Sequence, residues 1–345
     1  MAKMCFTKAL RPCHHLRMKL CLLTLLITAG FVSAQGLPLE QQLERLPVSQ
    51  TLFHEIELAD FAEELRHLSQ SPAKDGAAAS SINFVLLASS KETFSMPSRD
   101  LSLRELLQLG CKAFKVKAVF EPHAVLIVPL DHVFINPLAD AKDAKGQEAI
   151  WRRLYKPTVQ FEDASIEEAC EYLVTSIRAA CDPPLGQPPF NLLLKSTADA
   201  SSRKLSVDVR AVPIHDALRY IGELSRLELR YHANAVVLSP PGDRFIHAEL
   251  PGSSAAKQRA DKIVLPTVEL VGASLEDVVI FVRLKSKQLD PAGKDVQIVV
   301  KAGLKPSKHW DLSLRHVSVS EVLRYAAGMM EVKLIVDDAA YTFTE

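Results

Sequence analysis

Histidine has the widest chemical range of any residue type in this sequence, because imidazole can bind metal ions and transfer protons near neutral pH. Nine histidines follow residue 34, and none forms an HExxH motif or a spacing suited to a zinc site. His123 and His232 fall in equivalent turns of an internal repeat, which favours a turn or surface role. We therefore expect no metal site and no other cofactor.

Paired carboxylates could act as a general acid and base, and two such pairs occur, Glu167 with Glu168 and Glu276 with Asp277. Both pairs stand at the predicted starts of helices, where acidic side chains cap free backbone N–H groups and interact favourably with the helix dipole. The sequence has no G-x-S-x-G, P-loop or dinucleotide-binding motif. We interpret these carboxylates as helix caps and predict no catalytic residue and no enzymatic activity.

Three arginines and two tryptophans are the candidate partner-binding or inter-module residues. Arg99, Arg210 and Arg315 each stand at the same strand-to-helix turn of the repeat. Hydrogen bonding of local carbonyl groups is our preferred role for them, with a contact to a partner as the alternative. Trp151 and Trp310 are large aromatic residues that could anchor an interface, or that could pack in a core or between modules.

The elements that position these residues belong to an internal repeat. Residues 157–168 match residues 266–277, and residues 205–220 match residues 310–325 in the same order along the chain. A fainter third copy at 94–107 matches the second pair, and the three arginines coincide in it. A repeat of this kind predicts tandem copies of one structural module.

Each copy has the same predicted secondary structure. A short strand leads to a helix with apolar residues at i, i+3, i+4 and i+7, and two strands, a second helix and two closing strands follow. A Ser or Asp residue, followed three residues later by Glu or Asp, marks each helix start as a capping box. The predicted pairs are Asp60 with Glu63, Ser102 with Glu105, Ser165 with Glu168, Ser274 with Asp277, and Ser318 with Glu321. The fold class we predict is α+β, a tandem repeat of small two-layer modules, each with two helices packed on a mixed sheet of three to five strands.

Turn residues and charged stretches divide the chain. We predict a signal peptide at 1–34, an N-terminal linker at 35–50, module 1 at 51–131, a linker at 132–150, module 2 at 151–241, a linker at 242–262 and module 3 at 263–345. Module 1 is the most degenerate, since Pro97 stands where the other copies have Asp208 and Ser313 and removes a backbone donor from the strand.

The first 34 residues predict export. Five basic residues precede an apolar run at 20–29, and small residues follow it at the positions before Gln35, so cleavage is expected after about Ala34. A membrane anchor is the alternative, but the run is shorter than the ~20 residues of a spanning helix. Met18 is an alternative start. We predict a periplasmic or otherwise extracytoplasmic protein without a stable membrane span.

Charge argues against nucleic acid as a partner. The 41 basic and 41 acidic residues balance overall, but five of the basic ones and no acidic one lie in residues 1–34, so the rest of the chain is acidic. A nucleic-acid-binding chain normally has a basic excess. Small two-helix sheets can also resemble KH domains, but the sequence has no GXXG clamp between its helices.

The repeat resembles the secretin and TonB short N-terminal domain family. The resemblance rests on the strand and capped helix start at 157–168 and 266–277 and on the strand-turn-helix block at 205–220 and 310–325. It implies bacterial periplasmic modules that assemble into rings or contact partner proteins and perform no chemistry. The barrel-forming region of secretins has no counterpart after the third copy, so we expect no pore from this chain by itself.

The sequence therefore predicts an exported, non-enzymatic interaction or scaffold protein, whose partners are proteins of the cell envelope or other copies of the chain. An exposed strand edge in each module would allow β-augmentation. The alternative is a receptor-like protein that binds a small molecule or an envelope glycan between modules. Neither the partner nor the stoichiometry follows from the sequence.

Overall fold

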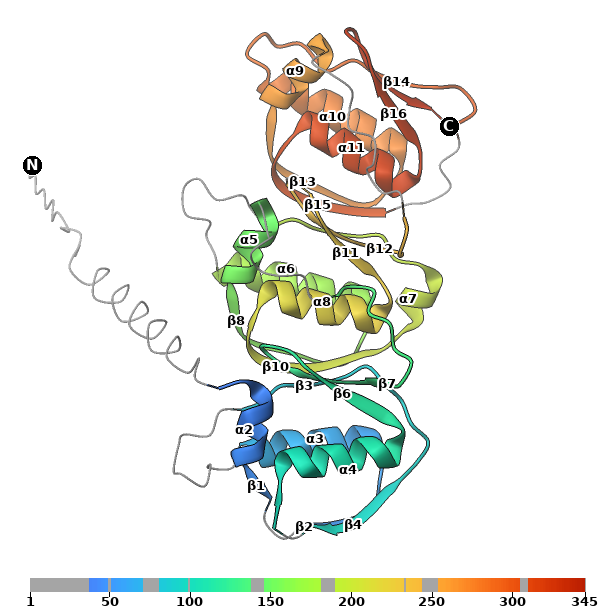
Figure 1. The fold of residues 1–345 in the computed structure, drawn as a ribbon. Coiled ribbons are helices and arrows are strands. Elements are labelled where there is room, and N and C mark those ends of the chain that lie inside the picture. The colour runs from blue at the N-terminus through green and yellow to red at the C-terminus, as the bar shows by residue number, and fades with distance from the viewer. Residues whose placement is uncertain are drawn as a thin grey trace, which may run out of the picture.

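Three modules of the same architecture follow one another along the molecule (Figure 1). The structure, a computed structural model, describes residues 37–48, 51–70, 81–98, 100–137, 146–180, 190–232, 234–243, 254–304 and 310–344. The predicted signal peptide lies outside these residues. In the part of the chain that the structure covers, no helix has the length and apolar character needed to cross a membrane.

The secondary-structure elements recur in the same order in each module. Module 1 contains α2 (Leu39–Arg45), β1 (Pro47–Val48), β2 (Thr51–Ile56), α3 (Leu58–Ser69), β3 (Phe84–Leu86), β4 (Phe94–Ser98), β5 (Leu101–Ser102), α4 (Leu103–Phe114), β6 (Val116–Phe120) and β7 (Val125–Pro129). Module 2 contains α5 (Gly146–Arg153), β8 (Tyr155–Ala164), α6 (Ile166–Ala180), β9 (Leu192–Leu194), α7 (Ala198–Ser202), β10 (Leu205–Pro213), α8 (Ile214–Ser225), β11 (Glu228–Tyr231) and β12 (Val236–Ser239). Module 3 contains α9 (Ala255–Lys262), β13 (Val264–Ala273), α10 (Leu275–Leu289), β14 (Ile298–Val300), β15 (Trp310–Ser318), α11 (Val319–Met330), β16 (Lys333–Val336) and β17 (Tyr341–Thr344).

The strands of each module form two kinds of sheet. The first is a mixed three-stranded sheet with one parallel and one antiparallel pair, in the orders β3-β7-β6, β9-β12-β11 and β14-β17-β16. The second is an antiparallel two-stranded sheet, formed by β2-β4, β8-β10 and β13-β15. Module 1 has a further antiparallel pair, β1-β5. The two long helices of each module lie between these sheets (Figure 1). The core residues of a module accordingly come from its helices and from both sheets.

The predicted α+β class and the tandem repeat with small mixed sheets are confirmed. The structure differs from the two-layer prediction in one respect, because the strands divide between two sheets on opposite sides of the helices. It also adds a short helix at the head of each module, in segments that the sequence analysis assigned wholly or mainly to linkers. These helices are α2, α5 and α9.

Left-handed backbone conformations mark the repeat independently of sequence similarity. All non-glycine residues with positive φ in the described chain fall at three repeated positions. The first is a bulge in the opening strand, at Glu55, Asp163 and Gly272. The second follows the repeated arginine, at Asp100, Ala211 and His316. The third caps the second long helix, at Lys115, Arg226 and Glu331. Because such a conformation is unfavourable for residues with a Cβ atom, its recurrence shows that each copy imposes the same backbone path.

Candidate interaction site at the module junctions

Each three-stranded sheet has one face toward the helices of its own module and an opposite face, formed by its outward residues, which we call its outer face. In modules 1 and 2 the following module buries the outer face. In β7, Val125 and Ile127 belong to the core of module 1, whereas Leu126 and Val128 belong to the core cluster of module 2. All four side chains are fully buried. Successive residues of a strand point to opposite faces of its sheet, so one strand supplies apolar residues to two cores. The junction between modules 1 and 2 is thus a continuous packed core.

The junction between modules 2 and 3 repeats this arrangement. In β12, Val236 and Leu238 belong to the core of module 2, and Val237 belongs to the core cluster of module 3. Leu193 in β9 also joins the core of module 3. The strands β10 and β15 of the incoming modules run close to β3 and β9, respectively.

A buried asparagine fixes the position of module 2 on module 1. The Nδ2 group of Asn83 donates to the carbonyl of His123 in its own module (2.8 Å) and to the carbonyl of Arg210 in module 2 (2.9 Å). The backbone N–H of Arg210 donates back to Oδ1 of Asn83 (2.7 Å). A carboxamide suits this site because it carries two donors and an acceptor together. The side chain of Asn83 therefore satisfies both backbone groups of one residue in the next module.

Asn191 makes the same set of contacts at the second junction. Its Nδ2 group donates to the carbonyls of Asn234 (2.9 Å) and Arg315 (3.1 Å), and its Oδ1 accepts from the backbone N–H of Arg315 (2.8 Å). Asn83 and Asn191 are both buried. We call this contact the asparagine clamp. It gives the stack its register, because a shifted module would leave buried polar groups without partners.

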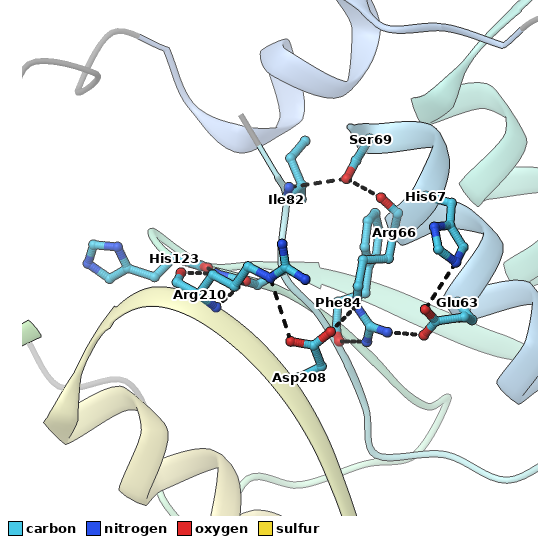
Figure 2. Close-up of polar contacts among 10 residues, drawn as sticks. Glu63, Arg66, His67, Ser69, Ile82, Phe84, His123, Asp208 and Arg210 are labelled. Atoms are coloured by element: carbon cyan, nitrogen blue, oxygen red, sulfur yellow. Dashed lines mark hydrogen bonds and ion pairs between the residues drawn. The ribbon is translucent and has the colours of Figure 1, made fainter. Parts of the chain in front are cut away.

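An arginine from the first long helix strengthens each junction. Arg66 in α3 donates to the carbonyl of Phe84 (3.3 Å), and its Nε lies 3.8 Å from Oδ2 of Asp208 in module 2 (Figure 2). Arg178 in α6, about one turn further along its helix, donates to the carbonyl of Phe190 (3.4 Å), which precedes Asn191 instead of following it, and, in module 3, to the hydroxyl (3.0 Å) and carbonyl (3.3 Å) of Ser313. Asp208 and Ser313 occupy equivalent strand positions.

The first junction also contains a buried ion pair. Arg219 in α8 of module 2 pairs with Glu121 in the turn between β6 and β7 of module 1, and both side chains are almost fully buried. Tyr220 donates its hydroxyl to Glu121 (3.3 Å), and Arg219 donates to the carbonyl of Asn136 (3.3 Å). A buried pair of this kind holds its geometry strongly, because a charge left without its partner in an apolar surrounding is very unfavourable.

Burial shifts the pKa values around this pair. It raises the pKa of the Glu121 carboxyl and of the Asp216 carboxyl, and the nearby charge of Arg219 opposes both shifts without cancelling them. Burial, together with the charges of Arg152 and Arg219, lowers the pKa of His215 to about 3. His215 is therefore neutral at pH 7, and its Nδ1 lies 2.7 Å from the hydroxyl of Tyr231.

The second junction has different charges at the equivalent positions. Arg324 takes the place of Arg219, but it pairs with Glu321 of its own helix, and both side chains are partly exposed. His232 takes the place of Glu121 in the turn. An ion pair between modules 2 and 3 is made elsewhere, by Lys195 and Glu331, at 3.1 Å. The apolar contacts and the asparagine clamp are thus common to both junctions, whereas the ion pairs are not.

The outer face of module 3 carries related residues but is exposed. Gln297 stands in the position of Asn83 and Asn191, and Arg283 donates to the carbonyl of Ile298 as Arg66 does to the equivalent carbonyl of Phe84. Gln297 and Arg283 are both exposed. Val299 and Ile335, on β14 and β16, expose 47% and 39% of their surface. No described residue of this chain takes the place of a following module there.

The predicted partner-binding residues lie in several environments. The backbone groups of Arg210 and Arg315 belong to the asparagine clamps, while their side chains are exposed. Arg99, their counterpart in module 1, lies outside the described residues. Trp151 is buried in the core of module 2 against Phe190, with ring centroids 4.5 Å apart, and Trp310 is buried in the core of module 3.

The paired carboxylates lie where capping predicts. Glu168 and Asp277 accept from the backbone N–H groups of Ser165 (2.7 Å) and Ser274 (2.9 Å), and Glu167 accepts from the hydroxyl of Ser201 (2.6 Å). The capping boxes predicted at Ser102 with Glu105, at Ser165 with Glu168 and at Ser274 with Asp277 are complete. At Ser318 the serine half of the contact is present.

The capping box predicted at Asp60 and Glu63 is wrong. The helix α3 begins at Leu58, so both residues lie inside it, and Glu57 precedes it without a side-chain cap. Leu58 is buried in the core of module 1, and the helix starts three residues earlier than the predicted cap at Asp60 implies. Asp60 lies in the first turn instead, where its charge still interacts favourably with the helix dipole.

The asparagine clamp is the feature that the sequence analysis missed. A signal was present, because Asn83, Asn191 and Gln297 each interrupt an apolar run at the same position of the repeat. A polar amide within a buried strand must find hydrogen-bond partners, which here belong partly to another module. His123 and His232 do lie in equivalent turns, next to the clamps. Among the described residues, no group of three or more His, Cys, Asp or Glu side chains could hold a metal ion.

No family model, curated protein or solved structure matches the chain.

Proposed function

We propose that this chain is an exported, non-enzymatic interaction or scaffold protein, which docks on a complex of the cell envelope or associates with other copies of itself. The observation that carries the proposal is the repeated junction, in which the outer face of one module receives the two-stranded sheet of the next through apolar packing and an asparagine clamp. A module with one surface for each neighbour is suited to assembly. Its resemblance to secretin and TonB N-terminal modules supports the same function.

Site-specific photocrosslinking in intact cell envelopes tests this proposal. The chain would carry benzoylphenylalanine at Ile335 on the outer face of module 3, at Leu52 on the two-stranded sheet of module 1, or, as a buried control, at Leu126. Crosslinked adducts of defined mass are expected from the two exposed positions and not from the control. Recovery of only the lone monomer from the exposed positions, or of the chain from the cytoplasm with residues 1–34 still attached, would overturn the proposal.

A further inference from the structure

We infer that the outer face of module 3 binds the two-stranded sheet of module 1 from a second copy of this chain. The inference rests on the proposed assembly function and names its partner and its surface. The chain itself supplies the template, because each of its two junctions joins an outer face to the two-stranded sheet of a module of the same kind. Among the residues that the structure describes, none covers the two-stranded sheet at one end of the stack or the outer face of the three-stranded sheet at the other.

The outer face of module 3 retains the elements used at the internal junctions. Gln297 offers the same carboxamide as Asn191 on a side chain one methylene longer, and it is exposed. Arg283 is held on the carbonyl of Ile298, as Arg66 is held on that of Phe84, and its side chain is also exposed. Val299 occupies the position of Val85 and Leu193, which are both buried by the following module.

The matching surface of module 1 is uncovered at the other end. Leu52, which pairs with Pro97 in the β2-β4 sheet, exposes 75% of its surface. Leu109 in α4 exposes 40%, whereas its counterparts Tyr220 and Tyr325 are fully buried. Among the described residues, no module precedes this surface. Leu109 is thus exposed at a position that the other modules bury, and Tyr220 at that position contacts Glu121 of the preceding module. Leu52 adds a second exposed leucine, where modules 2 and 3 carry the exposed polar residues Gln160 and Glu269. Two exposed leucines on this side of module 1 indicate a surface made for contact.

Exposed charges of opposite sign lie on the two end modules. Arg283 and Lys333 are exposed at module 3, and Glu55 and Asp100 are exposed at module 1. The contact is heterologous, because it joins two different surfaces, and it leaves one free surface of each kind on every dimer. Association therefore continues to longer assemblies, which are linear or close into rings.

Two charge substitutions test the inference on the purified full chain. Ile335→Asp blocks the outer face of module 3, and Leu109→Asp blocks the matching surface of module 1, because Leu109 stands where Tyr220 and Tyr325 are buried. Sedimentation velocity of the unsubstituted chain over a range of concentrations is expected to show assemblies that grow with concentration. Each variant alone is expected to associate at least about tenfold more weakly, since a buried unpaired carboxylate opposes contact. Val271→Asp is the matched control at another exposed apolar residue of module 3, and it is expected to leave association unchanged.

Mixing the two variants gives the decisive result. The Ile335→Asp chain keeps an intact surface on module 1, and the second variant keeps an intact outer face on module 3. The mixture is therefore expected to form dimers of one chain of each kind and nothing larger. Association of Leu109→Asp alone would instead indicate contact between two identical outer faces and would overturn the inference. An unsubstituted chain that stays monomeric at all concentrations would also overturn the inference. The outer face of module 3 would then be only the solvent-exposed end of that module. In either case the envelope crosslinks could still identify a different partner, so the proposed function would stand.

Discussion

The two junctions of this protein share their packing and differ in their charges. Both bury an outer face and both use an asparagine clamp, with nearly identical distances around Asn83 and Asn191. The first junction adds the buried pair of Glu121 and Arg219, whereas the second has a partly exposed pair of Lys195 and Glu331.

This difference separates two roles within a junction. The clamp uses backbone groups of the incoming module, so it depends little on which side chains that module carries. The ion pairs depend on specific residues of both modules and can therefore distinguish one junction from the other. The common part of the junction sets where a module docks, and the variable part sets how strongly and under which conditions it is held.

The largest difference is expected when the arginine of each junction is replaced. Arg219→Met leaves Glu121 buried without its partner and is expected to lower the free energy of unfolding of the first two modules by about 3–5 kcal/mol. Arg324→Met removes only a partly exposed pair within one helix and is expected to cost less than about 1 kcal/mol. Urea denaturation of the full chain, followed by tryptophan fluorescence, measures both.

A double variant controls for lost packing in this experiment. Glu121→Leu combined with Arg219→Met removes both charges and is expected to recover much of the lost stability, because no unpaired charge remains. Equal losses for Arg219→Met and Arg324→Met would show that the buried pair does not distinguish the two junctions.

Replacing the clamp asparagines by aspartate is expected to affect both junctions alike. Asn83→Asp and Asn191→Asp keep the shape of the side chain but put a carboxylate oxygen against two backbone carbonyls, at an expected cost of about 2–3 kcal/mol each. Gln297→Glu is the matched control, since Gln297 is exposed in the isolated chain. Denaturation midpoints and amide hydrogen exchange at Arg210 and Arg315 measure the effect. Unchanged exchange at both arginines would contradict the role of the clamp.

The sequence predicted what depends on local periodicity and missed what depends on contacts between modules. The i, i+3, i+4 pattern of residues such as Ile166, Ala169 and Leu173 predicts an amphipathic helix, and α6 buries these side chains. Helix α9 carries no such pattern, because Ala260 is its only fully buried residue among mainly polar ones, and the sequence analysis placed it in a linker. Local signals also could not place Asn83, because its partner Arg210 lies 127 residues away along the chain.

Acid is expected to lower the stability of module 2 through His215. His215 has a folded pKa of about 3 and an ordinary unfolded value near 6.5, so below pH 6.5 the unfolded chain binds the extra proton and stability falls. Between pH 7 and 5.5 the expected loss is about 1 kcal/mol. The raised pKa values of Glu121 and Asp216 act in the opposite direction, since there the folded chain takes up protons first as the pH falls.

A single substitution isolates the histidine. His215→Asn keeps a hydrogen-bonding side chain beside Tyr231 and removes the titration, so the fall in stability between pH 7 and 5.5 should disappear. His316→Asn is the matched control, because His316 is exposed at the second junction. Denaturation midpoints of the three chains at both pH values give the comparison. A pH dependence that persists in His215→Asn would assign it to another group.

The smallest expected effect concerns the left-handed residue that follows each clamped arginine. Ala211 and His316 have φ values of 51° and 50°, a conformation that is unfavourable for any residue with a Cβ atom. Ala211→Gly and His316→Gly are each expected to raise the free energy of unfolding by up to about 1 kcal/mol. Gly272→Ala tests the opposite sign at the repeated bulge, because its added Cβ would meet no atom within 4 Å and only the backbone conformation, at φ 56°, opposes it. Because the two junctions share this backbone path, equal gains in the free energy of unfolding are expected from Ala211→Gly and His316→Gly. A gain from only one of them would show that the two modules are held differently at the clamp itself.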